Sequence, residues 1–160
     1  MTDSKRLEFQ NGHCLTAPLP ERQCEYTFVR HDAALRASFV ELTANESYGY
    51  LWVRDQDGEI VVLEDKPHFS PDGRHFAVVV SCEALGTSFC GIQIWSAEGP
   101  SVIWEHKVET YAEYAFIRWH GNHWISLSVL TNKDNSLVNS PAAVIETAPK
   151  TWSLRSHGEK

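Results

Sequence analysis

The chain has 160 residues, 42% of them hydrophobic and 22% charged, which excludes a disordered protein and fits one soluble domain with a proper core. The formal net charge is −7, and the lysines and arginines form no basic run, so a nucleic-acid-binding surface is not expected. Six Trp, five Tyr and seven Phe residues favour strands over helices.

The first 25 residues are polar and contain proline, and we predict an N-terminal arm or an additional edge strand there. They include no apolar core of signal-peptide length, and no stretch of the chain approaches the roughly 20 apolar residues of a membrane span. We therefore expect a cytoplasmic protein that does not contact membranes.

In that compartment the cysteines are expected to be reduced thiols. No Cys-x-x-Cys pair occurs, so the sequence predicts no structural zinc. Cys82 and Cys90 flank a seven-residue loop and are placed to face each other across a hairpin. The four cysteines are Cys14, Cys24, Cys82 and Cys90.

The first predicted unit, residues 26–63, consists of two hairpins. The second of these is "GYLWVRDQDGEIVVLED", with a turn at residues 55–58, and the first is "EYTFVRHDAALRASFVEL", with a turn near Asp32. The turn at 55–58 resembles the start of a calcium-binding loop, but position 12 of that loop is Lys66 instead of a bidentate Glu. A hairpin turn is the better interpretation.

The second predicted unit, residues 67–106, begins with "PHFSPDGRHFAVVV". Pro71 presets φ at the first corner of the turn, Asp72 can bond its own backbone, and Gly73 tolerates positive φ. The turn therefore reverses the chain between two strands. The apolar run after it is typical of an inner strand that is covered on both faces. A second hairpin follows in "GIQIWSAEGPSVIWEH".

The third predicted unit, residues 114–155, repeats this pattern 48 residues later, counted from Gly73 to Gly121. When these two glycines are aligned, His123 falls on His75, and both copies continue into an apolar strand. A second hairpin, "AAVIETAPKTWSLR", completes the unit. A short tail, residues 156–160, follows it.

Four-stranded units that recur at a spacing of about 40 to 50 residues are typical of propeller blades. "FSPDGRHFAVVV" followed by "IQIWSAEG" resembles the SPDG-type β-propeller repeat and, more distantly, the WD-repeat blade. The resemblance covers residues 69–104 well, the third unit in part and the first unit poorly. It implies blade geometry and no particular activity. We therefore predict an all-β fold of antiparallel four-stranded meander units, arranged as three propeller-like blades or as an open twisted β array.

Three units are fewer than the four or more blades of closed propellers. Such an array leaves sheet edges and an apolar end face exposed. We therefore expect a second copy of the chain or another protein to cover that surface.

Short turns are expected at one end of the units and longer connections, where function is often found, at the other. The richest longer connection is "EHKVETYAEY". Its glutamates suit Arg and Lys of a basic partner, and tyrosine is favoured in interfaces. The predicted partner-binding residues are Glu105, Glu109, Tyr111, Glu113 and Tyr114. The alternative is a solvated, partly helical connector between blades.

Motifs of catalysis are missing from the sequence: it has no nucleophile elbow, no phosphate-binding glycine loop and no zinc-protease helix motif. We predict no catalytic residue, no metal site and no cofactor. His120 and His123 lie within one turn, but two ligands are too few for a metal. An aromatic cross-strand pair that closes the hairpin is the better interpretation.

These observations favour a noncatalytic protein-binding module, for example an immunity or inhibitor protein that masks a basic partner. The acidic net charge would steer such a partner toward the protein. One alternative is a structural or assembly module that completes a β array by oligomerisation. Another is a small-ligand binder or an enzyme with a histidine-containing pocket.

Overall fold

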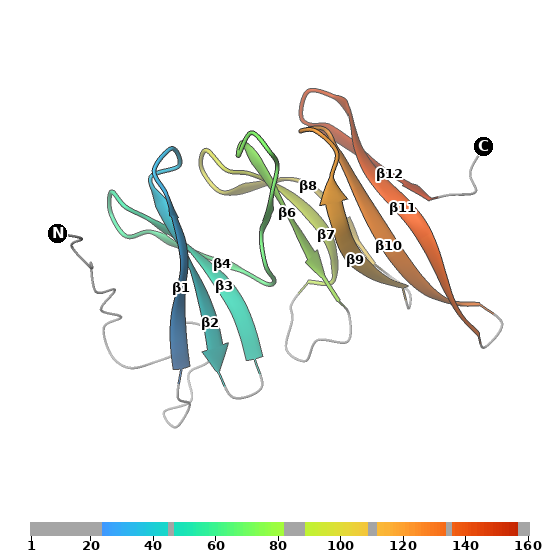
Figure 1. Ribbon diagram of the computed structural model, residues 1–160, viewed down its shortest axis with the longest axis horizontal. Coiled ribbons are helices and arrows are strands. Elements are labelled where there is room, and N and C mark those ends of the chain that lie inside the picture. Colours follow the sequence, from blue (N-terminus) through green and yellow to red (C-terminus); the bar gives the residue numbers. More distant parts are fainter. Residues whose placement is uncertain (1–23, 45–46, 82–88, 109–111, 134–135, 157–160) are drawn as a thin grey trace.

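Three four-stranded sheets stand in a row, in chain order, in the computed structural model of this protein (Figure 1). The structure describes residues 24–44, 47–81, 89–108, 112–133 and 136–156. Each sheet is an antiparallel meander in which the strands follow one another in sequence order. These residues include no helix and no sheet closes into a barrel, so the predicted open all-β array is confirmed.

The strands are assigned to the sheets as follows. The first sheet consists of β1 (Cys24–Asp32), β2 (Ala37–Ala44), β3 (Ser47–Arg54) and β4 (Ile60–Leu63). The second consists of β5 (His68–Phe69), β6 (His75–Val80), β7 (Gly91–Ser96) and β8 (Ser101–Lys107). The third consists of β9 (Ala112–Trp119), β10 (Trp124–Lys133), β11 (Ser136–Ala148) and β12 (Thr151–Ser156).

The two aligned glycine turns have the same backbone conformation and lie in contact. Gly73 has φ of 72° and Gly121 has φ of 61°, as predicted from their place in the turns. The backbone amide of Asp72 donates to Oδ1 of Asn122 at 3.1 Å. This bond joins the β5–β6 turn to the β9–β10 turn and therefore fixes the second sheet against the third at this end.

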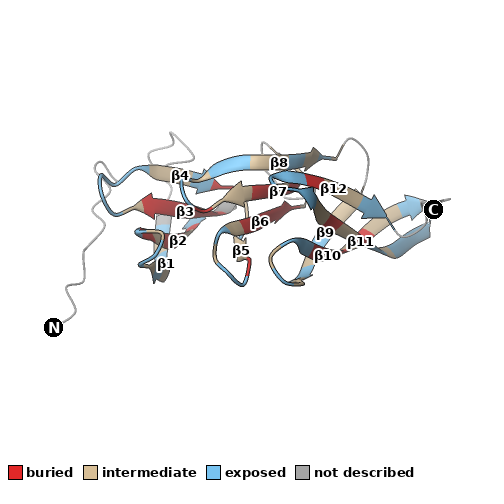
Figure 2. Ribbon diagram, turned by 90° about the horizontal axis from the view of Figure 1, so that it is seen from above, coloured by how far each residue is buried: buried red, intermediate tan, exposed pale blue. Residues whose placement is uncertain are grey.

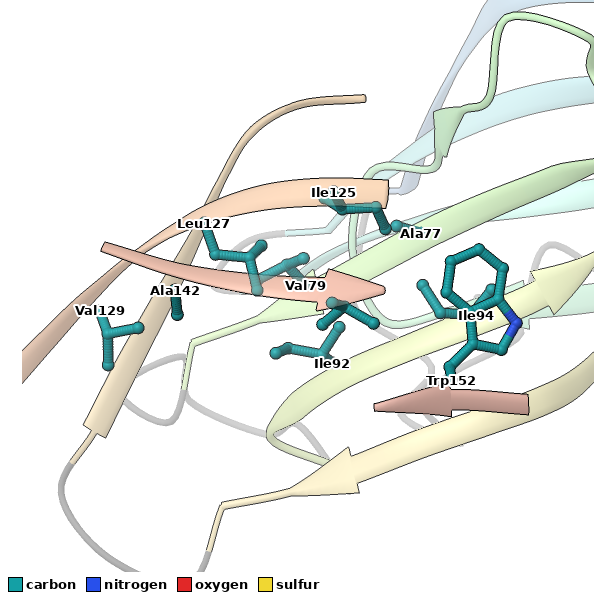
Figure 3. Close-up of a cluster of buried hydrophobic side chains, with 10 residues drawn as sticks. Ala77, Val79, Ile92, Ile94, Ile125, Leu127, Val129, Ala142 and Trp152 are labelled. Carbon is teal, nitrogen blue, oxygen red and sulfur yellow. The ribbon is translucent and has the colours of Figure 1, made fainter. Parts of the chain in front are cut away.

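The largest core cluster lies between the second and third sheets (Figure 3). Its side chains come from alternate positions of facing strands, because successive side chains of a strand point to opposite faces. The second sheet contributes Ala77, Val79, Ile92 and Ile94, and the third contributes Ile125, Leu127, Val129, Ala142, Val144 and Trp152. The indole of Trp119 adds a hydrogen bond from Nε1 to the His68 carbonyl at 2.8 Å.

The other face of β6 packs toward the first sheet. Phe76, Val78 and Val80 form a cluster with Tyr50 and Leu63 of the first sheet. Consequently β6 is buried on both faces, as its continuous apolar run predicts, and Figure 2 shows it as a buried strand in the middle of the row.

A third cluster lies on the face of the first sheet that points away from the second sheet. It consists of Val40, Leu42, Leu51 and Val53, whose relative exposure is between 0% and 5%. The described side chain of Tyr26 packs at its margin, and burial raises the pKa of this phenol. The outer face of the first sheet is therefore part of the core.

The start of β7 differs from the sequence-based expectation. Cys90 is disulfide-bonded, so the prediction of a reduced thiol is wrong for this residue, and its partner sulfur is outside the described side chains. The next residue, Gly91, has φ of 137°, and a Cβ atom there would lie 2.0 Å from the His106 carbonyl oxygen. Only glycine fits where β7 passes so close to β8.

Candidate interaction surface on the third sheet

The predicted partner-binding connection is mostly strand in the structure. β8 continues to Lys107 and β9 begins at Ala112, so Glu105 is an exposed residue of β8, and Glu113 lies in β9. The Nε2 atom of Gln93 donates to Oε2 of Glu105 at 3.5 Å. The two glutamates therefore belong to different sheets.

Tyr114 follows Glu113 in β9 and points to the opposite face. Its ring packs against the core cluster between the second and third sheets, and its hydroxyl lies 3.4 Å from Nε2 of His106. Burial raises the pKa of the phenol. Glu109 and Tyr111 lie outside the described residues. The structure therefore does not bring the described members of the predicted patch, Glu105, Glu113 and Tyr114, together on one face.

A different surface stands out on the third sheet, on the face that points away from the second sheet. We call it the outer face of the third sheet. The pairing register places one residue of each strand in a single row across it. In the order β9, β10, β11 and β12, the row is Arg118, Ser126, Ala143 and Arg155. An exposed arginine thus stands on each edge strand, with two short side chains between them.

Trp124 lies beside this row, two residues before Ser126 and on the same face of β10. It is 40% exposed, and its ring stacks on His120 with 3.9 Å between centroids. Nε of Arg118 donates to Nε2 of His120 at 3.2 Å, and Oγ of Ser126 lies 3.1 Å from the same nitrogen. The predicted aromatic pair at this hairpin is therefore His120 with Trp124, whereas Trp119 packs on the inner face.

The row on one side of the arginine row is also shallow, because it carries small side chains. Ala115 and Pro141 are exposed and pair with Ser128 from either side. Ser153 pairs with Ile145, which in turn pairs with Trp124. The face is thus a low floor between two arginines, with an aromatic residue beside it.

Arg118 and Arg155 outnumber Glu113, the described acidic residue that shares this face, although the chain as a whole is acidic. In the first sheet, Arg30 pairs with Asp32, and Arg54 pairs with Asp57 and Glu59. Among the residues that the structure describes, neither Arg118 nor Arg155 forms an ion pair. Apart from the Nε donor that Arg118 gives to His120, their guanidinium groups can therefore donate to another molecule.

The nearby carboxylate of Glu146 belongs to the other face. It pairs with Nδ1 of His123 and accepts a hydrogen bond from the Lys150 amide at 2.8 Å. Partial burial raises the pKa of this carboxyl, but the hydrogen bonds from His123 and Lys150 outweigh it and the pKa is lowered. Within the described ranges, no group of three His, Cys, Asp or Glu residues is placed to hold a metal ion.

Sequence reasoning missed the arginine row because Arg118 and Arg155 share no local motif. One signal was present: in "WISLSVL", apolar and small polar residues alternate, which indicates a strand with one buried and one open face. The facing positions on β9 and β12 followed only from the pairing register.

Comparison with protein-family models, with curated proteins and with solved structures found no match to this chain. The likeness to SPDG-type and WD-like repeats consequently stays a prediction. The part of the chain that the structure describes has no helix long and apolar enough to span a membrane.

Proposed function

We propose that this protein is a noncatalytic protein-binding module that uses the outer face of the third sheet. The observation that supports this most directly is the exposed row Arg118, Ser126, Ala143 and Arg155 beside Trp124. Arginine and tryptophan are enriched among the residues that dominate binding energy in protein interfaces. The opposite face of the third sheet packs against the second sheet, so a rigid scaffold holds the side chains of the outer face.

The role is that of an inhibitor or immunity-type protein, which acts by covering part of its partner. A flat β surface with short side chains lets another backbone approach closely without displacing large groups. The basic partner expected from the net charge stays a prediction, because no finding tests it. The outer face of the third sheet instead presents two arginines and therefore suits a partner with acidic groups.

A pull-down from a lysate of the source organism tests this function. The baits are the wild-type protein, Ala115→Trp, which places a bulky ring on the outer face, and Ser101→Trp, which alters an exposed position of β8. We expect one protein in stoichiometric amount with the wild type and with Ser101→Trp, and its loss with Ala115→Trp. Retention by all three baits, or no stoichiometric partner, contradicts the proposal.

The assembly module is the second candidate, because the same exposed face ends the row of sheets (Figure 1). Light scattering over a range of concentrations separates it from partner binding. A dimer of the wild type that Ala115→Trp converts to a monomer would favour assembly. A monomer at all concentrations would favour the binding module.

The predicted cytoplasmic location of the protein also needs a test. The sequence interpretation assigned the protein to the cytoplasm, whereas a disulfide at Cys90 is typical of oxidising compartments. Labelling of free thiols in protein taken directly from the source organism distinguishes the two locations. Protection of Cys90 from the label would contradict the cytoplasmic assignment.

A further inference from the structure

We propose that the outer face of the third sheet binds an extended acidic protein segment whose carboxylates pair with Arg118 and Arg155. This inference rests on the proposed binding function and specifies its chemistry. The two arginines belong to one row of the sheet, one on each edge strand, and the described residues provide neither of them with a carboxylate.

The spacing of the arginines fits such a segment. Neighbouring strands are about 4.8 Å apart, so three intervals separate the two Cα atoms by about 14 Å. In an extended chain, two residues four positions apart are separated by about 13 Å. A segment with acidic residues at positions i and i+4 that lies across the strands therefore brings one carboxylate to each guanidinium, and arginine can hold a carboxylate with two parallel hydrogen bonds.

The floor of the row lets the segment lie close to the sheet. Ser126 and Ala143, the two residues between the arginines, carry the short side chains. An extended backbone can approach such positions more closely than it can approach leucine or phenylalanine. The long arginine side chains at the two edges then stand on either side of the segment.

Trp124 adds an apolar contact at the margin of this floor. Its ring is held by the stack on His120, and 40% of its surface is open. His120 in turn accepts a hydrogen bond from Arg118, so the aromatic and cationic groups are positioned together. An apolar residue between the two acidic residues of the segment would meet this ring.

Two other occupants fit less well. The net charge of −7 repels every anionic ligand over long range, and it repels a nucleic acid, with one charge per nucleotide, more than a segment with two carboxylates. A second copy of this chain could extend the row by placing the outer face of its first sheet here, but that face is already buried, as Leu51 shows with 0% exposure. An acidic segment of a different protein needs only the short-range pairing that the two arginines provide.

A peptide-binding measurement tests the proposal. The probe is a fluorescein-labelled ten-residue peptide with Glu at positions 3 and 7 and Leu at position 5 in a Ser/Thr background, and its control carries Gln at both positions. Fluorescence anisotropy at low salt gives the Kd for the full-length protein and for Arg118→Gln, Arg155→Gln and the double variant. Arg36→Gln, an exposed arginine in a turn of the first sheet, changes the net charge equally and is the matched control.

We expect the Glu peptide to bind more tightly than the Gln peptide. Each single substitution should weaken binding by about threefold to fivefold and the double variant by about tenfold or more, in keeping with exposed ion pairs. Arg36→Gln should bind as the wild type does. Equal binding of the two peptides, or unchanged binding by the double variant, would overturn the proposal. Tighter, arginine-dependent binding of a single-stranded oligothymidylate would also overturn it, in favour of a nucleic-acid ligand.

The double variant also serves as a bait in the pull-down, so that the two proposals can fail separately. Loss of the partner with both Ala115→Trp and the double variant supports the acidic segment. Loss with Ala115→Trp but retention by the double variant overturns the arginine chemistry and leaves the binding function intact.

Discussion

The first and third sheets both end the row, but their outer faces differ in burial. On the first sheet, Val40, Leu42, Leu51 and Val53 are almost completely buried. On the third, the corresponding face carries Ser126 and Ala143 between exposed arginines. The outermost face of such a repeated unit can therefore be either a buried core or an open surface. In this protein, the open surface that is available for binding lies on the third sheet.

The difference originates in the strand sequences. In β3, apolar residues occupy consecutive positions, so both faces can be buried. In β10, apolar Ile125, Leu127 and Val129 alternate with Ser126 and Ser128. Substitutions in the two terminal sheets test this contrast.

The largest expected effect comes from truncation of a leucine on each outer face. Leu51→Ala should lower the free energy of unfolding by about 2–5 kcal/mol, because it leaves a cavity at a fully buried position. Leu130→Ala, at a partly exposed position of β10, should cost less than about 1 kcal/mol. Urea unfolding monitored by tryptophan fluorescence measures both values. Similar losses in the two variants would mean that the outer faces do not differ in burial.

A reciprocal exchange sharpens the comparison. Val40→Ser should destabilise the protein by about 2–3 kcal/mol, because it removes buried apolar groups and buries a hydroxyl. Ser128→Val should change stability by less than about 1 kcal/mol, because it loses only the hydrogen bond to Asn139 and leaves no cavity. Thermal unfolding of the two variants side by side is the measurement. A large loss of stability in Ser128→Val would indicate that the third-sheet face is covered within the chain.

The bond between the aligned turns supports the third sheet specifically. Asn122→Ala removes the acceptor of the Asp72 amide and should cost about 1 kcal/mol. Asn139→Ala is the control, since its partner Ser128 lies within the third sheet and on the exposed face. Hydrogen exchange should become faster in β9 and β10 for Asn122→Ala. Equal exchange in the two variants would contradict a fixing role for this contact.

The smallest expected effect is a loss of folding stability at low pH that comes from one hairpin turn in each terminal sheet. Hydrogen bonds from Arg54 and the Glu59 amide lower the pKa of Asp57 from 3.8 to about 2. Because the folded-state pKa is below the unfolded value, the ionised Asp57 carboxylate stabilises the folded protein above pH 3.8. This stabilisation is lost as the pH falls through about 2. The Glu146 carboxylate should also stabilise the folded protein less as the pH falls. Its pKa is lowered from 4.5 by the hydrogen bonds from His123 and Lys150, against the opposing effect of burial.

Asp57→Asn and Glu146→Gln should therefore lose less stability than the wild type between about pH 5 and pH 2. Urea midpoints across this range give the comparison. A wild-type profile parallel to both variants would show that neither carboxylate is favoured in the folded state. A difference in only one variant would locate the acid-sensitive turn in one of the two sheets.

Much of the architecture was predictable from local patterns. Gly73 and Gly121 adopt the positive φ expected of their turns, and β6 is buried on both faces, as its apolar run indicates. These features depend on residues close together in sequence. The candidate site was not predictable in this way, because Arg118 and Arg155 meet on one face only through the registers of three strand pairs.

The connection between Glu105 and Tyr114 was predicted to be one of the longer loops between units. In the structure Glu105 lies in β8 and Tyr114 in β9, with the tyrosine packed inward. Edge strands tolerate polar residues because one side faces water, so polarity alone did not separate strand from loop.

By itself, the sequence determined the strands, their turns and the all-β class, since turn residues and apolar runs act over a few neighbouring positions. Only the tertiary structure decided which terminal face is buried and which is open, and which arginines share a row. The physical reason is that face and register depend on the packing of whole sheets, a property of strands that are far apart along the chain.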